Sequence, residues 1–159
     1  MTDFEALYEK YARDVFRFAL FLSGNRADAE DIASETFVRA WNAPGEIRQA
    51  TVKAYLLVIA RNCYLQSLRR SGRQAPLEGD FADPRQAPHD SAEQRAELQQ
   101  VMHDLQQLPE VDRTALLLSA AEDMSYEQIA ETLGLSLGSV KTKIHRGRLR
   151  LEQARSQRM

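Results

Sequence analysis

The clearest chemical signal in the sequence is a run of hydroxyl and basic side chains between residues 139 and 150. On a helix whose buried stripe is Val140, Ile144 and Leu151, the side chains that point outward are Ser139, Lys141, Thr142, Lys143, His145, Arg146, Arg148 and Arg150. Lysine and arginine bind guanine edges and phosphates, and small hydroxyl residues let the backbone approach DNA closely. The pattern predicts a DNA-binding helix; a soluble basic face on a helical hairpin is the alternative.

The residue types that catalytic and metal centres need are sparse. The three histidines, His89, His103 and His145, have no i,i+4 spacing, and Cys63 is the single cysteine. One cysteine excludes an internal disulfide and any site with several cysteine ligands. We therefore expect no enzymatic activity, no metal and no cofactor.

A helix-turn-helix would present this basic face to DNA. Ser125 and Gln128 form a capping box for a short helix over 126–133, and Gly134 permits a sharp turn at its end. Ser136 then caps the helix that carries the basic face. The small or apolar residues Ala130, Gly134 and Val140 have the spacing at which two such helices cross.

The charge distribution separates this basic helix from an acidic block. The 159 residues carry a net charge of −2, with +1 in residues 1–71, −2 in 72–92, −7 in 93–135 and +6 in 136–159. The strongly basic C-terminal segment can bind phosphate, although an ordinary solvent-exposed helix face has a similar charge composition.

The remaining sequence predicts an all-α protein with two small domains joined by a flexible linker. Helices are expected from the Thr2–Glu5 capping box to Gly24, from Asn25 to Trp41, and from about Thr51 to Arg70. Residues 72–92 contain three prolines and two glycines, typical of a linker. Helical periodicity resumes at the Ser91–Gln94 capping box, so the expected domains are 1–71 and 93–159.

Two of the expected helices have an apolar stripe that should face the core. In the first helix the stripe consists of Phe4, Leu7, Tyr8, Tyr11, Val15, Phe18, Ala19 and Leu22. In the helix that follows the linker it consists of Leu98, Val101, Met102, Leu105 and Leu108.

The apolar stretches are too short for a membrane. A spanning helix needs a run of about 18 apolar residues, and the longest near-apolar stretch is Ala54 to Ala60. The N-terminal residues include acids where a signal peptide has bases. We expect a cytoplasmic protein without membrane insertion.

The C-terminal half resembles region 4 of bacterial sigma factors, and most closely the extracytoplasmic-function (ECF) subfamily, which has only regions 2 and 4 joined by a linker. The motifs that carry the resemblance are Leu105–Pro109, Tyr126–Ser136 and Gly138–Arg148. The resemblance implies that the basic helix reads the −35 promoter element as duplex DNA.

The N-terminal half resembles region 2 of the same family. The stretch Asp28–Trp41 is similar to the helix that docks on the clamp coiled coil of the RNA polymerase β′ subunit, which implies core polymerase-binding residues Asp28, Asp31, Ser34 and Glu35. By spacing, Asp28, Asp31 and Glu35 share one helix face, although ordinary enrichment of acids in a first helical turn gives a similar pattern.

The stretches Tyr55–Asn62 and Leu68–Arg70 resemble the region 2 helix that reads the −10 element as a melted strand. Asn62 offers a donor and an acceptor to a base edge, while Arg61, Arg69 and Arg70 are expected to hold phosphates. The family forms its base pocket with the preceding loop, here about Pro44 to Thr51. Trp41 and Tyr55 flank this loop, and core packing is favoured over base stacking for both.

The resemblance implies a monomeric, non-enzymatic sigma factor. Its expected partners are core RNA polymerase, through the β′ clamp and the β subunit, promoter DNA and an anti-sigma factor. Apolar surface on two small domains would suit the anti-sigma factor. A stand-alone helix-turn-helix regulator is the alternative, although nothing in the sequence resembles a dimerisation helix or ligand domain.

Overall fold

The computed structural model describes residues 3–43, 51–71 and 91–158, and these contain seven α-helices and no strand. In chain order the helices are α1 (Asp3–Ser23), α2 (Arg26–Asn42), α3 (Val52–Ser71), α4 (Ala92–Gln106), α5 (Glu110–Ala120), α6 (Tyr126–Leu133) and α7 (Leu137–Arg158). The expected all-α class is confirmed. The linker 72–92 and the loop Pro44 to Thr51 lie almost wholly outside the described residues.

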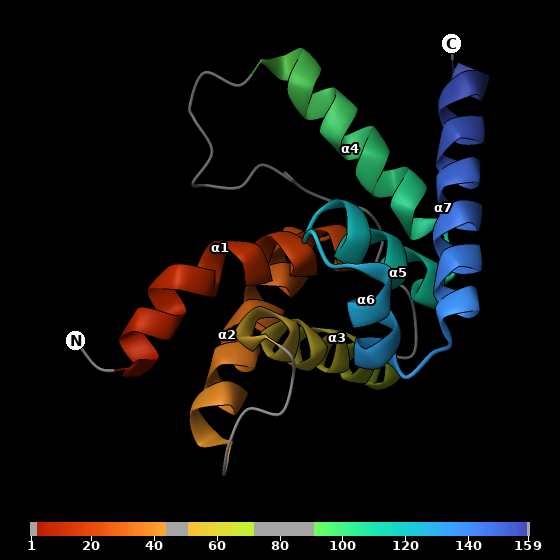
Figure 1. Ribbon diagram of the computed structural model, residues 1–159. Helices are drawn as coiled ribbons and strands as arrows, with labels where there is room; N and C mark the ends of the chain where they lie inside the picture. Colours follow the sequence, from red (N-terminus) through yellow and green to blue (C-terminus); the bar gives the residue numbers. More distant parts are fainter. Residues whose placement is uncertain (1–2, 44–50, 72–90, 159) are drawn as a thin grey trace.

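Helices α1, α2 and α3 pack on one another and form the first half of the molecule (Figure 1). The predicted cap at Asn25 is confirmed, because its side chain accepts a hydrogen bond from the Asp28 amide at 2.9 Å. Thr51 caps α3 in the same way through the Ala54 amide. Phe18 and Leu56 are among the most deeply buried side chains of this half.

Helices α4 to α7 form the second half, in which α7 packs mainly on α5 and α6. Both predicted capping boxes are present: the Ser91 and Ser125 side chains accept from the amides of Gln94 and Gln128, whose side chains accept in return. In Figure 1, the N-terminal end of α4 lies away from α7 and its C-terminal end lies beside α7, while α5 and α6 lie nearer to the first half.

Three of the expected core positions are wrong. Trp41, near the end of α2, is 62% exposed, although its ring meets Phe4 edge-on, with centroids 4.7 Å apart. Tyr8 and Val101 are 50% and 43% exposed. The helical pattern predicts which side of a helix is apolar, but it does not show how far the neighbouring helix extends. Tyr55 packs partly buried against the core, as expected.

The two halves are in direct contact. Gln106 of α4 donates to the carbonyl groups of Phe21 and Leu22 at the end of α1. Gly24 makes this approach possible, because its φ is +71° and a Cβ there would lie 2.8 Å from the Gln106 side chain. Buried Arg113 of α5 donates to the Tyr64 hydroxyl of α3 at 3.0 Å. The apolar core is therefore continuous across both halves.

Within the described ranges, no helix is both long and apolar enough to cross a membrane. The same residues contain no group of histidine, cysteine and carboxylate side chains that could hold a metal ion. Cys63 is buried with a free thiol.

Candidate nucleic-acid and protein interfaces

Helices α6 and α7 form the predicted helix-turn-helix. Gly134 ends α6 with a φ of +67°, in the left-handed region that favours glycine. The Ser136 hydroxyl then accepts a hydrogen bond from the Ser139 amide at 3.1 Å and starts α7. Val140 and Ile144 are buried, so the orientation of α7 on its neighbours is fixed by its apolar side.

The side chains of the predicted recognition surface lie on the opposite side of α7. Lys141, Thr142, His145 and Arg148 are exposed, whereas Ser139 and Lys143 are half-buried. The geometry thus brings hydroxyl and cationic groups together along the first three turns of the second helix. Such a surface can donate hydrogen bonds to phosphates and to acceptors on base edges.

Arg146 is held by a residue that the sequence did not single out. Its guanidinium donates two hydrogen bonds, of 2.7 and 2.8 Å, to the carboxylate of Asp112 on α5, which is buried. This bidentate contact fixes the plane of the guanidinium and ties α7 to α5. Arg146 therefore combines a structural contact with an exposed position beside Lys143 and His145.

Gly147 lets α7 approach α5 closely, since a Cβ there would already lie 3.4 Å from Leu116. We expect Gly147→Leu to lower the free energy of unfolding by about 1–3 kcal/mol, because the larger side chain must displace the core. Gly138→Leu is the matched control, since no atom lies within 4 Å of a Cβ at that position. Thermal unfolding followed by circular dichroism measures both, and equal melting temperatures would contradict the close packing.

The predicted polymerase-binding residues on α2 do not share one environment. Asp31 and Glu35 are exposed and line a shallow depression with Arg39, Cys63 and Arg70 on the side of α3. Ser34 lies instead in a groove between α1 and α2. Asp28 is half-buried, and burial, together with the neighbouring Asp31, raises the pKa of its carboxyl group.

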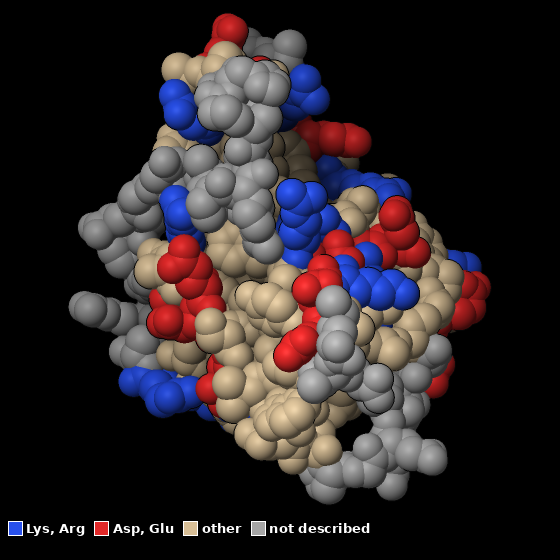
Figure 2. Space-filling model, turned by 90° about the vertical axis from the view of Figure 1, so that its left-hand side faces the viewer, with Lys and Arg blue, Asp and Glu red and all other residues tan. Residues whose placement is uncertain are grey.

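The groove beside Ser34 is partly aromatic. Tyr8, Phe16 and Phe37 line it, and the Tyr8 and Phe37 rings meet edge-on with centroids 4.9 Å apart. In Figure 2, which shows the side of the molecule with the N-terminal half of α1, an uncharged area lies between acidic and basic groups. This side therefore combines uncharged and charged surface.

The predicted DNA-binding residues on α3 divide into two groups. Arg69 and Arg70 are exposed near the helix end, and Asn62 is exposed at the rim of a small cavity between the halves, which Thr132 and Leu133 of α6 also line. Arg61, by contrast, is half-buried and its guanidinium is already paired. It donates two hydrogen bonds of 2.9 Å to Glu110 of α5.

Glu110 is held as a carboxylate. Its burial alone would raise its pKa, but hydrogen bonds from Arg61 and Thr114 outweigh this effect and hold the pKa below its ordinary value. A depressed pKa in the folded state means that the contact contributes stability at neutral pH. This contribution is lost as the pH falls through the lowered pKa.

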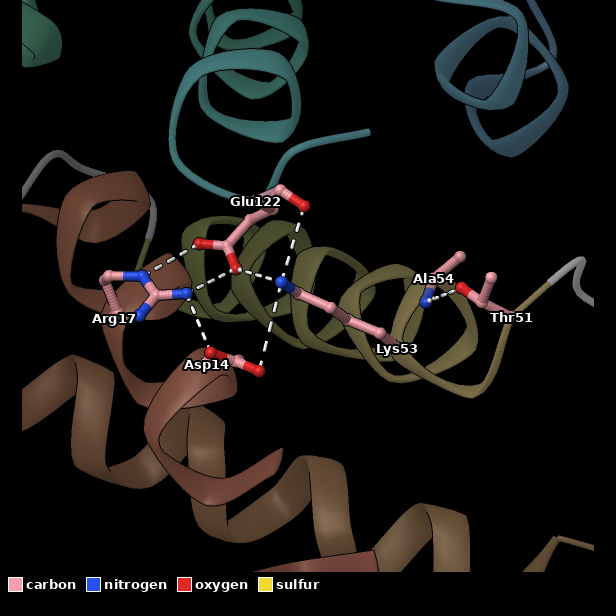
Figure 3. A network of polar contacts seen from close by, with 6 residues as sticks. All are labelled: Asp14, Arg17, Thr51, Lys53, Ala54 and Glu122. Carbon is pink, nitrogen blue, oxygen red and sulfur yellow. Dashed lines mark hydrogen bonds and ion pairs between the residues drawn. The ribbon is translucent and has the colours of Figure 1, made fainter. Parts of the chain in front are cut away.

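A second ionic contact between the halves centres on Glu122, which follows α5 (Figure 3). Its fully buried carboxylate accepts hydrogen bonds of 2.8 and 3.1 Å from Arg17 of α1 and pairs with Lys53 of α3 at 3.2 Å. Asp14 pairs with Arg17 from the other side. None of these residues was singled out by sequence, because the partners are up to 105 positions apart.

Comparison with known families agrees with this architecture. Residues 7–74 match the Sigma-70 region 2 family, and residues 98–151 match Sigma-70 region 4. These two matches define the class: a chain with regions 2 and 4 of a sigma factor, which is a transcription initiation factor. Two relatives then identify the subfamily of sigma factors, and two solved structures show the same fold.

The ECF RNA polymerase sigma factor SigE of Mycolicibacterium smegmatis is 38% identical over 160 residues, which cover 95% of this chain but only 61% of SigE. SigL of Mycobacterium tuberculosis, also an ECF sigma factor, is 33% identical over 145 residues, 88% of this chain and 81% of SigL. The chain belongs to the ECF sigma factors.

Solved structures have the same fold. The sigma factor RpoE of Bartonella quintana, solved in complex with the anti-sigma factor NepR, aligns with a TM-score of 0.81 at 27% identity over 98% of both chains. CnrH, solved with the cytosolic domain of CnrY, aligns with a TM-score of 0.71 at 26% identity, over 94% of this chain and 85% of CnrH.

Proposed function

We propose that the protein is a non-enzymatic initiation subunit that directs core RNA polymerase to promoters. In this function α7 reads the −35 element in the major groove, and α3, with Asn62, reads the melted −10 strand. A cytoplasmic location follows from the need to meet polymerase and DNA. The observation that carries the proposal is the helix-turn-helix with its cationic outer side, combined in one chain with a region 2 fold.

The partners follow from the same two regions. We infer that the exposed carboxylates of Asp31 and Glu35 dock on the β′ clamp and that region 4 contacts the β subunit. The related RpoE and CnrH were solved with NepR and CnrY, of which NepR is an anti-sigma factor. An anti-sigma factor is therefore a proposed partner of this chain too. The uncharged areas between charged groups on the side shown in Figure 2 suit such a protein.

Reconstitution with core polymerase, followed by run-off transcription on genomic fragments, tests the function directly. Discrete transcripts that depend on the added chain would support it and would identify the promoter. A protein that binds duplex DNA specifically but never associates with polymerase would instead be a stand-alone helix-turn-helix regulator. The region 2 half, which matches a separate sigma-factor family, favours the initiation subunit.

Lys143 tests the proposed −35 contact. We expect Lys143→Ala to weaken binding to the cognate −35 sequence by about 1–3 kcal/mol and to relax base preference there. Arg155→Ala is the matched control, because it removes one exposed charge from the same helix three turns further on. Competition binding of holoenzyme to cognate and altered −35 duplexes measures both. Equal weakening on every sequence would show that Lys143 contacts phosphate only.

A further inference from the structure

A buried carboxylate on α5 holds one arginine of the predicted recognition surface on α7. The Asp112 side chain is 2% exposed and accepts hydrogen bonds of 2.7 Å from Nε and 2.8 Å from Nη2 of Arg146, whose side chain is 45% exposed. Among the described residues, the other lysine and arginine side chains of this surface have no carboxylate partner, namely Lys141, Lys143, Arg148 and Arg150. Arg146 is therefore set apart from its neighbours by a fixed orientation.

We propose that Asp112 is a positioning residue for base reading, which holds the Arg146 guanidinium so that its free edge meets the O6 and N7 acceptors of one guanine in the −35 element. The proposal rests on the proposed function, in which α7 reads this element. It deepens that function by naming the base edge and the residue of α5 that sets the orientation. Asp112 itself is buried and acts through Arg146.

The donors that remain on Arg146 match a guanine. A guanidinium has five N–H donors in one rigid plane. Asp112 takes one donor from Nε and one from Nη2, which leaves the outer edge with one N–H on Nη2 and two on Nη1. Two parallel donors on this edge fit the O6 and N7 acceptors that guanine presents in the major groove. Because the plane is fixed before DNA binds, less side-chain freedom is lost on binding.

The charge of the pair favours a base over a phosphate. The Asp112 carboxylate and the Arg146 guanidinium together have no net charge, so the pair adds little to the counterion release that drives phosphate binding. The free N–H donors nevertheless keep their direction, and direction is what reading a base edge requires. The unpaired cations of the same surface can bind the phosphates instead.

The packing of α5 on α7 explains how a short aspartate side chain reaches Arg146. The two helices lie side by side (Figure 1). Asp112 and Leu116 are one turn apart on α5, and a Cβ at Gly147, the residue after Arg146, would lie 3.4 Å from Leu116. Gly147 thus lets the helices approach closely at the turn that carries Arg146, which brings the carboxylate within reach of the guanidinium.

A second contact of the same kind provides a matched control. Asp104 of α4, whose side chain is 9% exposed, pairs at 2.8 Å with Arg158 near the end of α7. Loss of either carboxylate frees one arginine of α7 and removes one contact with a neighbouring helix. Arg158, however, follows Arg146 by twelve residues, or about 18 Å along the helix, and lies beyond the predicted recognition surface.

The test selects −35 sequences with holoenzyme reconstituted from core polymerase and the full chain. The probe is a pool of duplexes that carry the promoter found by run-off transcription with its −35 element randomised, and sequencing of the bound fraction gives the base preference at each position. Asp112→Asn keeps the shape of the side chain but removes its charge. We expect it to lower the preference for guanine at one position at least about fivefold, the lower end of what a bidentate base contact supplies. Total binding of the pool should not fall, and Asp104→Asn should select as the wild type does.

Arg146→Lys keeps the test independent of folding at Asp112, because it changes an exposed side chain and preserves its charge. Lysine has no planar edge, so this variant should lose the same guanine preference at the same position. The double variant Asp112→Asn/Arg146→Lys should lose no more than either single variant, since both act on one contact.

The positioning role is overturned if Asp112→Asn leaves every base preference unchanged, or if it weakens binding to all sequences alike together with a lower melting temperature, as loss of a purely structural contact would. Equal effects of Asp112→Asn and Asp104→Asn would overturn it too. A wild-type holoenzyme that yields no transcript and selects no sequence would overturn the proposed function and the positioning role together, whereas wild-type selection that the Asp112 variant shares overturns the positioning role alone.

Discussion

Reversing the charge of both Asp31 and Glu35 to lysine is expected to lower the affinity for core polymerase at least about a hundredfold, equivalent to about 2.8 kcal/mol. The two carboxylates are exposed and line one depression beside α3. If they dock on a basic surface, the double reversal creates two like-charge contacts, which cost several kcal/mol at an interface. Native gel shift or size-exclusion chromatography with core polymerase measures the loss.

The fold should survive this change. Exposed substitutions usually alter stability by only about 0.5 kcal/mol, and the Glu35–Arg39 pair that is lost is a surface contact of 3.0 Å. Glu9→Lys is the control, because Glu9 is exposed on α1 and lines neither this depression nor the groove beside Ser34. It should bind polymerase nearly normally. Normal holoenzyme assembly by the double variant would show that α2 docks through another face.

Asn62→Ala is expected to impair formation of the open complex more than initial promoter binding. Asn62 is exposed on α3, and among the described residues its side-chain amide has no hydrogen bond that would give it a structural role. A base contact made only after strand separation stabilises the melted state and not the closed one. Loss of such a contact costs about 1–3 kcal/mol, or about 5- to 150-fold in the open-complex equilibrium.

A promoter mismatched across the −10 element distinguishes reading from melting. This template removes the cost of unpairing but keeps the need to hold the bases. Permanganate footprinting and run-off yield should therefore show only partial rescue of Asn62→Ala. Complete rescue would mean that Asn62 assists separation without reading a base, and an unchanged yield on both templates would remove it from the site. Gln99→Ala, on α4, controls for loss of an exposed side-chain amide.

The helices and the helix-turn-helix could be predicted from sequence because their signals are local. A capping box needs two residues three positions apart, and both reciprocal hydrogen bonds are present at Ser125 and Gln128. Gly134 has the left-handed backbone that its place at the end of α6 required. Val140 and Ile144 follow the helical period and are buried as expected. Physical chemistry within one or two turns therefore determined the secondary structure, the basic side of α7 and the acidic side of α2.

Tertiary structure alone decided which charged groups meet. Arg61 and Arg146, both predicted to contact DNA, pair with Glu110 and Asp112, which lie 49 and 34 positions away. Glu122 meets Arg17 across 105 positions. Periodicity separates the apolar side of a helix from its polar side, but the partner of a polar group depends on which helix packs against it and at what angle. The same limit applies to Trp41, whose exposure results from the end of α2 extending past its neighbours rather than from its own residue type.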